Sequence, residues 1–148
     1  MSYRMSVSQD IAAPIEQVFD RAADFANAAN TIEAITKMEM LTEGPVGVGT
    51  RFRETRVMFG REATEEMEIV EFNRPQGYRL FAESHGSRYD SGLSFEQIEG
   101  GTRVTMHFEG TPVTFMAKIM SFMMKPMMKK MVSICAKDLE DLKAAVEK

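Results

Sequence analysis

The feature that most constrains the fold is a glycine-free stretch near the carboxyl end, from Thr111 to Val146. Its apolar residues recur mostly three or four positions apart, which predicts one long amphipathic helix. Thr111 followed by Pro112 is typical of a helix start, because threonine caps free amides and proline loses no hydrogen bond at the first helical position. An apolar stripe of this length has to be covered, so we expect the rest of the chain to form a surface that holds it.

The length of this helix conflicts with the size of the chain. A straight helix of about 35 residues would be roughly 50 Å long, whereas a compact domain of 148 residues is only about 40 Å across. Pro126 resolves the conflict, since its ring clashes with a preceding carbonyl and it lacks an N–H. We therefore predict two helical segments, a front one rich in Met and Phe and a back one from about Pro126 to Glu147.

Methionine is concentrated at the predicted break. Seven of the fourteen methionines lie between Met116 and Met131. Methionine is flexible and polarisable, so it fills irregular space and adapts to partners of different shape. The pattern therefore leaves three uses open: packing beside a kink, a wall that faces an apolar ligand, or a surface that contacts a membrane or a partner protein.

Positive charge is concentrated in the same part of the chain. Between Thr111 and Lys137 there is no acidic residue, and there are five lysines: Lys118, Lys125, Lys129, Lys130 and Lys137. The net charge of −4 is therefore the sum of +5 in this segment and −9 elsewhere. Lys118, Lys125 and Lys129 share one helical face, which is either a solvated surface or a docking surface for anionic lipid headgroups. The acidic chain has no basic patch interleaved with aromatics, so we expect no nucleic-acid partner.

The length and composition predict one domain over residues 1–148, with enough chain to bury a core. No apolar run follows Arg4, so no signal peptide is expected. The longest uncharged apolar run of the predicted helix, 119–124, is too short to cross a bilayer. We therefore expect a cytoplasmic protein without stable membrane insertion. The single cysteine, Cys135, excludes an internal disulfide and a multi-Cys zinc site, and its place on the apolar stripe predicts a buried thiol.

The remainder of the chain has the alternation and punctuation of β-structure. Alternating apolar residues predict a first strand over 3–11, and Pro14 then starts a short helix that is followed by a second short turn ending near Asn30. Six further strands are expected, at 35–40, 51–59, 61–72, 77–83, 88–98 and 102–109. Short connections indicate antiparallel neighbours. The fold class is thus α+β, a seven-stranded curved antiparallel sheet around the long C-terminal helix, with room for a cavity between them.

Three segments carry a family resemblance. They are Ile11–Phe19, Gly44–Phe52 and Glu65–Pro75. The glycine cluster in the second segment has the order G-x-x-G-x-G ahead of a strand, so it does not predict a dinucleotide site. With the order of elements, these segments resemble the START-like (SRPBCC) superfamily, the helix-grip fold of polyketide cyclases and dehydrases, lipid-transfer domains and birch-pollen allergens. The resemblance implies a hydrophobic tunnel that holds a lipid, sterol, isoprenoid or aromatic polyketide, often without catalysis.

Strand alternation indicates which polar side chains face that interior. Tyr78 and Tyr89 share parity with Leu80 and Leu93, so their hydroxyls are expected to point inward. On the third strand either Arg51 with Arg53, or Phe52 with Glu54 and Arg56, faces inward, and alternation does not decide between the two sets. The expected ligand contacts are Tyr78, Leu80, Tyr89, Leu93, Met106, Phe115, Met116, Ile119, Met120, Met123 and Met127.

The sequence offers no strong catalytic constellation. His85 belongs to a glycine-flanked turn and is expected to be exposed, and His107 is expected on the outer face of its strand. Neither has metal-ligand spacing, so no metal and no other cofactor is expected, and no nucleophile has an adjacent base.

The sequence therefore favours a binder, and possibly a carrier, of a hydrophobic small molecule. One alternative is a polyketide cyclase or dehydratase in which a buried tyrosine, arginine or acid moves a proton. A second alternative is a module that docks on a membrane or partner through the basic Met-rich helix.

Overall fold

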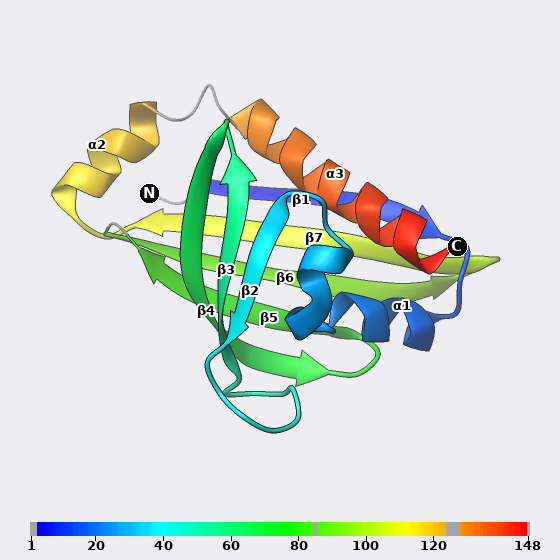
Figure 1. The fold of residues 1–148 in the computed structure, drawn as a ribbon. Helices are drawn as coiled ribbons and strands as arrows, with labels where there is room; N and C mark the ends of the chain where they lie inside the picture. Colours follow the sequence, from blue (N-terminus) through cyan, green and yellow to red (C-terminus); the bar gives the residue numbers. More distant parts are fainter. Residues whose placement is uncertain (1–2, 85, 124–127, 148) are drawn as a thin grey trace.

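A computed structural model describes residues 3–84, 86–123 and 128–147, which form one curved sheet and its covering helices (Figure 1). The elements in chain order are β1 (Tyr3–Ile11), α1 (Ile15–Ala22), the 3₁₀ helix η1 (Phe25–Asn30), β2 (Ile35–Met40), β3 (Arg51–Met58), β4 (Arg61–Asn73), β5 (Gly77–Ser84), β6 (Ser87–Ile98), β7 (Gly101–Pro112), α2 (Phe115–Met123) and α3 (Met128–Val146). The predicted α+β helix-grip architecture, with two short helices after the first strand, is confirmed.

The sheet is antiparallel and has the strand order β1-β7-β6-β5-β4-β3-β2. Strands β2 to β7 follow the chain order, because tight turns or short loops join each one to the next. β1 pairs instead with β7, in a register that runs from Tyr3 opposite Gly110 to Ile11 opposite Thr102. A register shift between Ile69 and Glu71 interrupts β4, and such bulges bend a strand. The sheet curves around α3, which lies along β1.

The carboxyl-terminal helix starts later than predicted. β7 continues through Pro112, which pairs with Ser87 of β6, so Thr111 and Pro112 end a strand and do not start a helix. The backbone N–H groups of Val113 and Thr114 both donate to the Gly86 carbonyl, at 2.8 Å and 3.2 Å, and fix this strand end. The Thr114 hydroxyl then accepts a hydrogen bond from the Ala117 N–H at 3.2 Å, as a helix cap does.

Two helical segments follow, as predicted, and they differ in their surroundings. The break predicted at Pro126 concerns residues 124–127, which lie outside the described part of the chain. α3 buries Cys135, Leu139, Leu142 and Val146, so the predicted buried thiol is confirmed. α2 stands apart from the sheet (Figure 1) and carries large apolar side chains into solvent. No helix of the described residues is long and apolar enough to cross a bilayer.

The core lies between the inner face of the sheet and helices α1 and α3. Its buried apolar residues are Ile11, Val18, Phe19, Ala23, Phe25, Phe52, Ile69, Tyr78, Phe95, Val104, Leu139, Leu142 and Val146. The Phe19 ring lies edge-on to the rings of Phe72, Phe95 and Tyr78, with centroids 5.1–6.0 Å apart. Such geometry is the favoured one for aromatic pairs. This aromatic packing joins α1 to strands β4, β5 and β6.

Candidate functional site

A cavity of about 430 Å³ lies between the concave face of the sheet and α3. Its volume falls in the range typical of small-molecule sites, about 300–1,000 Å³. Most of its wall is apolar. The apolar contributors include Ile35, Met38, Phe52, Met58, Met67, Leu80, Leu93, Met106, Phe108, Met131, Ile134 and Leu142. The curved sheet therefore leaves more space over its concave face than the apolar stripe of α3 fills.

The strand residues expected to contact a ligand lie on this wall. Tyr78, Leu80, Tyr89, Leu93 and Met106 all line the cavity. β5, β6 and β7 place them there because each strand turns alternate side chains to the concave face. Their contact with a ligand stays a prediction.

The α2 residues expected on the wall lie elsewhere. Phe115 and Met116 are 75% and 67% exposed, and Ile119 and Met120 are also exposed. None of the four lines the cavity, because β7 extends past the predicted helix start and α2 then projects away from the sheet. Their role as ligand contacts also stays a prediction.

The described methionines on the helical side of the cavity come from α3. Met128 and Met131 face the interior there. The side chain of Met123 and the whole of Met127 lie outside the described residues.

β3 turns Phe52 and Glu54 inward and Arg51 and Arg53 outward. This settles the alternative that alternation leaves open. The Phe52 ring stacks on Phe25 of η1, with ring centroids 4.8 Å apart, and the residues of the same parity, Glu54 and Arg56, therefore reach the cavity wall.

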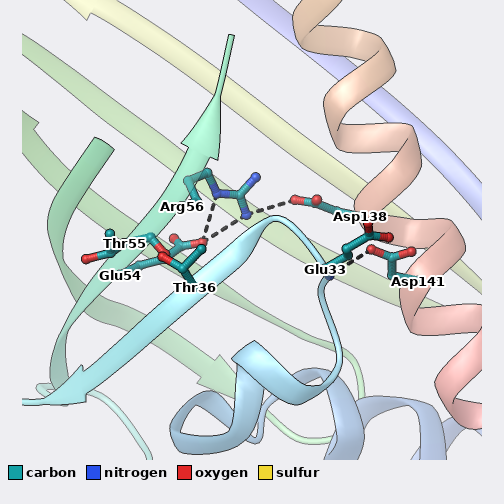
Figure 2. A network of polar contacts seen from close by, with 7 residues as sticks. All are labelled: Glu33, Thr36, Glu54, Thr55, Arg56, Asp138 and Asp141. Atoms are coloured by element: carbon teal, nitrogen blue, oxygen red, sulfur yellow. Dashed lines mark hydrogen bonds and ion pairs between the residues drawn. The ribbon is translucent and has the colours of Figure 1, made fainter. Parts of the chain in front are cut away.

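Glu54, Arg56 and Asp138 form a buried ion-pair cluster in that wall (Figure 2). Nη2 of Arg56 lies 2.9 Å from Oε1 of Glu54 and 2.9 Å from Oδ2 of Asp138, and Nε of Arg56 donates to the same Glu54 oxygen at 3.1 Å. The three side chains are only 11%, 16% and 8% exposed, respectively. Because Asp138 belongs to α3 and the other two belong to β3, the cluster links the helix to the sheet across one end of the hydrophobic interior.

The cluster contains two carboxyl groups and one guanidinium. Burial raises the pKa of Asp138, and the positive charge of Arg56 opposes that rise. Burial also works to lower the pKa of Arg56, but the charges of Glu54 and Asp138 outweigh it and leave that pKa raised. Arg56 is thus a permanent cation. Oδ1 of Asp138 is buried and has no hydrogen-bond partner among the described residues.

The hydroxyl groups of three tyrosines, Tyr78, Tyr3 and Tyr89, add polar positions to the wall. Burial, and next the charge of Glu54, raise the pKa of Tyr78, whose hydroxyl donates to the Ala22 carbonyl at 3.4 Å. Burial and the neighbouring Tyr89 raise the pKa of Tyr3. Tyr3 and Tyr89 both lie against the Phe108 ring, with centroids 6.2 Å and 5.8 Å away. The raised pKa values keep the hydroxyls of Tyr3 and Tyr78 neutral at physiological pH. All three tyrosine hydroxyls can donate or accept hydrogen bonds.

The other candidates from the sequence lie away from the chemistry of the cavity. His107 is exposed on the outer face, as predicted, where its Nε2 lies 3.1 Å from the Ser94 hydroxyl. His85 and Lys125 are outside the described residues, and Lys118 and Lys129 are exposed. Burial raises the pKa of the Cys135 thiol to about 11, so this cysteine is not an activated nucleophile.

The sequence interpretation missed Asp138. A signal for it was present, because Asp138 follows Cys135 by three positions and precedes Leu142 by four. That spacing places a carboxylate on the apolar stripe of the helix, where an acid needs a buried partner.

Several solved structures share this architecture over nearly the whole chain. TTHA0849 from Thermus thermophilus superposes with a TM-score of 0.80 at 21% identity, covering 97% of each chain. The Zhui aromatase/cyclase from a Streptomyces species has a TM-score of 0.78 at 14% identity, over 99% of this chain and 94% of that one. A START superfamily protein from Mycobacterium smegmatis has a TM-score of 0.76 at 15% identity, over 97% of both. At these identities the likeness shows the fold alone.

A comparison with curated proteins finds no match. The family model for polyketide cyclase / dehydrase and lipid transport matches residues 2–147. This match takes in every strand and helix from which the cavity is built. The chain belongs to the polyketide cyclase / dehydrase and lipid transport family.

Proposed function

We propose that this protein binds, and carries, a small hydrophobic molecule in the cavity between the sheet and α3. The observation that carries the proposal is a cavity of about 430 Å³ with a mainly apolar wall and a few polar groups gathered in it. That combination is typical of sites that bury most of a small ligand and orient it by a small number of polar contacts.

The first experiment is native mass spectrometry of the purified protein, followed by organic extraction. We expect one small molecule per chain, or stoichiometric uptake of a neutral fluorescent probe, N-phenyl-1-naphthylamine, by the delipidated protein. An empty protein that binds neither this probe nor any member of a lipid panel would contradict the proposal.

A matched pair of variants on β6 ties binding to the cavity. Leu93 lines the cavity and its neighbour Ser94 is exposed on the other face. Leu93→Trp fills the cavity and should abolish probe binding, while its circular dichroism spectrum should remain that of the folded protein. Ser94→Trp adds the same side chain outside and should bind normally. Equal binding by both variants would place the ligand elsewhere.

The alternative function is a cyclase or dehydratase that folds a reactive chain in the same cavity. The buried cluster favours it, because Asp138 combines a raised pKa with a place in the wall, as an acid–base group requires. Asp138→Asn would then remove turnover of a linear poly-ketone while leaving its affinity unchanged. If turnover follows affinity across such variants, proton transfer by this residue is the wrong mechanism.

A second alternative, docking on an anionic membrane, is supported by the exposed apolar face of α2. Phe115 and Met116 lie in solvent beside Lys118, a combination typical of helices that lie in the headgroup region. Phe115→Ser with Met116→Ser, or Lys118→Glu with Lys129→Glu, should reduce co-sedimentation with phosphatidylglycerol vesicles. Val48→Ser, at a 69% exposed loop position, is the control. Unchanged sedimentation of both double variants would exclude this function.

A further inference from the structure

The buried cluster has hydrogen-bonding capacity that the protein itself does not use. Both bonds that Glu54 accepts from Arg56 go to Oε1, and Oε2 has no partner among the described residues. Within the same described part of the chain, Nη1 of Arg56 makes no bond and Asp138 accepts only at Oδ2. All three residues line the cavity, so the free Nη1 donor of Arg56 and the free Oε2 acceptor of Glu54 lie close together in its wall, whereas Oδ1 of Asp138 is itself buried.

The charge of the cluster decides which ligand group fits there. Two carboxylates face one guanidinium, so the ionised cluster carries an excess negative charge. A ligand carboxylate could accept from Nη1, but it would bring a third negative charge to a site of low dielectric. A ketone or ether accepts from Nη1 and offers the carboxylates nothing. A hydroxyl accepts one hydrogen bond and donates another, and adds no charge.

We propose that the cavity ligand carries a neutral hydroxyl group, alcohol or phenol, which accepts from Nη1 of Arg56 and donates to Oε2 of Glu54, with its apolar body along the rest of the cavity. This inference rests on the proposed binding function and narrows its ligand class. The unused hydrogen-bonding groups of the cluster are the same whatever the apolar body of the ligand is. The cluster therefore selects only the polar group at the end of the ligand.

The test uses two probe series, one with a dodecyl chain and one with a naphthalene ring. Each series contains the hydroxyl compound, its methyl ether and the matching carboxylate, and the dodecyl series adds the amine. Dissociation constants come from displacement of N-phenyl-1-naphthylamine from the delipidated protein. In at least one series we expect the hydroxyl compound to bind about tenfold more tightly than its ether and its carboxylate, as a charge-assisted hydrogen bond allows.

Asp138→Asn removes the excess charge with little change in shape, so the penalty against the carboxylate should fall about tenfold in this variant. Glu140→Gln removes one carboxylate from the exposed side of α3 and should leave the selectivity unchanged.

The failures are distinguishable. If all members of a series bind equally, or if the ether, carboxylate or amine binds best, the cavity is a binding site but the hydroxyl inference is overturned. If Asp138→Asn and Glu140→Gln show the same selectivity, the cluster is not its source and the inference is overturned. If no probe binds and extraction yields no ligand, the proposed binding function and the hydroxyl inference are both overturned.

Discussion

Arg56 is the residue on which the buried charges depend. It is the cation that contacts both Glu54 and Asp138, and removing it leaves two carboxyl groups facing each other in the interior. Removing Asp138 instead leaves a neutral pair. The two sides of the same ion pair are therefore not equivalent.

We predict that Arg56→Met lowers the free energy of unfolding by about 3–5 kcal/mol, since it strands uncompensated buried charge. Asp138→Asn should change that free energy by less than about 1 kcal/mol. Urea denaturation at neutral pH measures both. Arg53→Met, on the exposed face of the same strand, is the control, with an expected loss of under about 1 kcal/mol. A mild effect of Arg56→Met would mean that water reaches the cluster.

The raised pKa of Asp138 predicts a pH dependence. The unfolded chain releases this proton near the ordinary pKa of 3.8, and the folded chain releases it at a higher pH. The stabilising effect of the bound proton is therefore present at low pH and lost as the pH rises through this interval. The stability of Asp138→Asn relative to the unmodified protein should rise between about pH 4 and pH 7. Thermal unfolding across this range tests it, and a difference that falls with pH would contradict the sign.

Part of this cluster could be predicted from the sequence. Alternation reduced β3 to two sets of side chains, but each set contains arginine, so hydrophobicity did not separate them. The deciding partner, Asp138, lies 82 positions beyond Arg56. Such a pairing depends on the tertiary placement of α3, which local patterns do not contain.

Among the elements, β6 shows how closely neighbouring strands of the curved sheet approach each other. A Cβ added at Gly92 would lie 2.4 Å from the Tyr78 carbonyl oxygen and 3.2 Å from the Arg79 Cα. Both contacts are to the backbone of β5, which pairs with β6 here. Glycine at this position lets the two strands come together beside the cavity.

We predict that Gly92→Ala destabilises the protein by about 1–3 kcal/mol, because backbone has to move to admit the methyl group. Gly47→Ala is the matched control, since an added Cβ there meets nothing within 4 Å. Comparing the urea midpoints of the two variants measures the difference. Equal midpoints would show that β5 and β6 separate at little cost.

The sequence predicted the strands and their neighbours well, because period-2 alternation and glycine turns are local signals. It failed at the junction of β7 and α2, where Thr111 and Pro112 fit a helix start as well as a strand end. Pairing of Pro112 with Ser87 decided the outcome. That pairing joins segments 25 positions apart. For the same reason the α2 residues expected to contact a ligand lie outside the cavity lining, and their contact with a ligand stays a prediction.

For the whole molecule, an open cavity means that occupancy adds stability. A ligand that binds only the folded state at one hundred times its dissociation constant contributes about 2.7 kcal/mol. For a chain of 148 residues this corresponds to a rise in Tm of roughly 5–10 °C. Differential scanning calorimetry of the delipidated protein, with and without the extracted ligand or N-phenyl-1-naphthylamine, checks this. Leu93→Trp should show no rise, and an equal rise in that variant would point to binding outside the cavity.

The pairing of β1 with β7 governs when this interior comes into existence during translation. Tyr3 meets Gly110 in the sheet, and α3 covers β1 only after every other element has been made. A nascent chain that has been synthesised only as far as β6 therefore lacks both β7, the strand that pairs with β1, and the covering helix α3. Long-range pairings of this kind slow folding, so the complete wall of the cavity forms only after β7 and α3 have been synthesised.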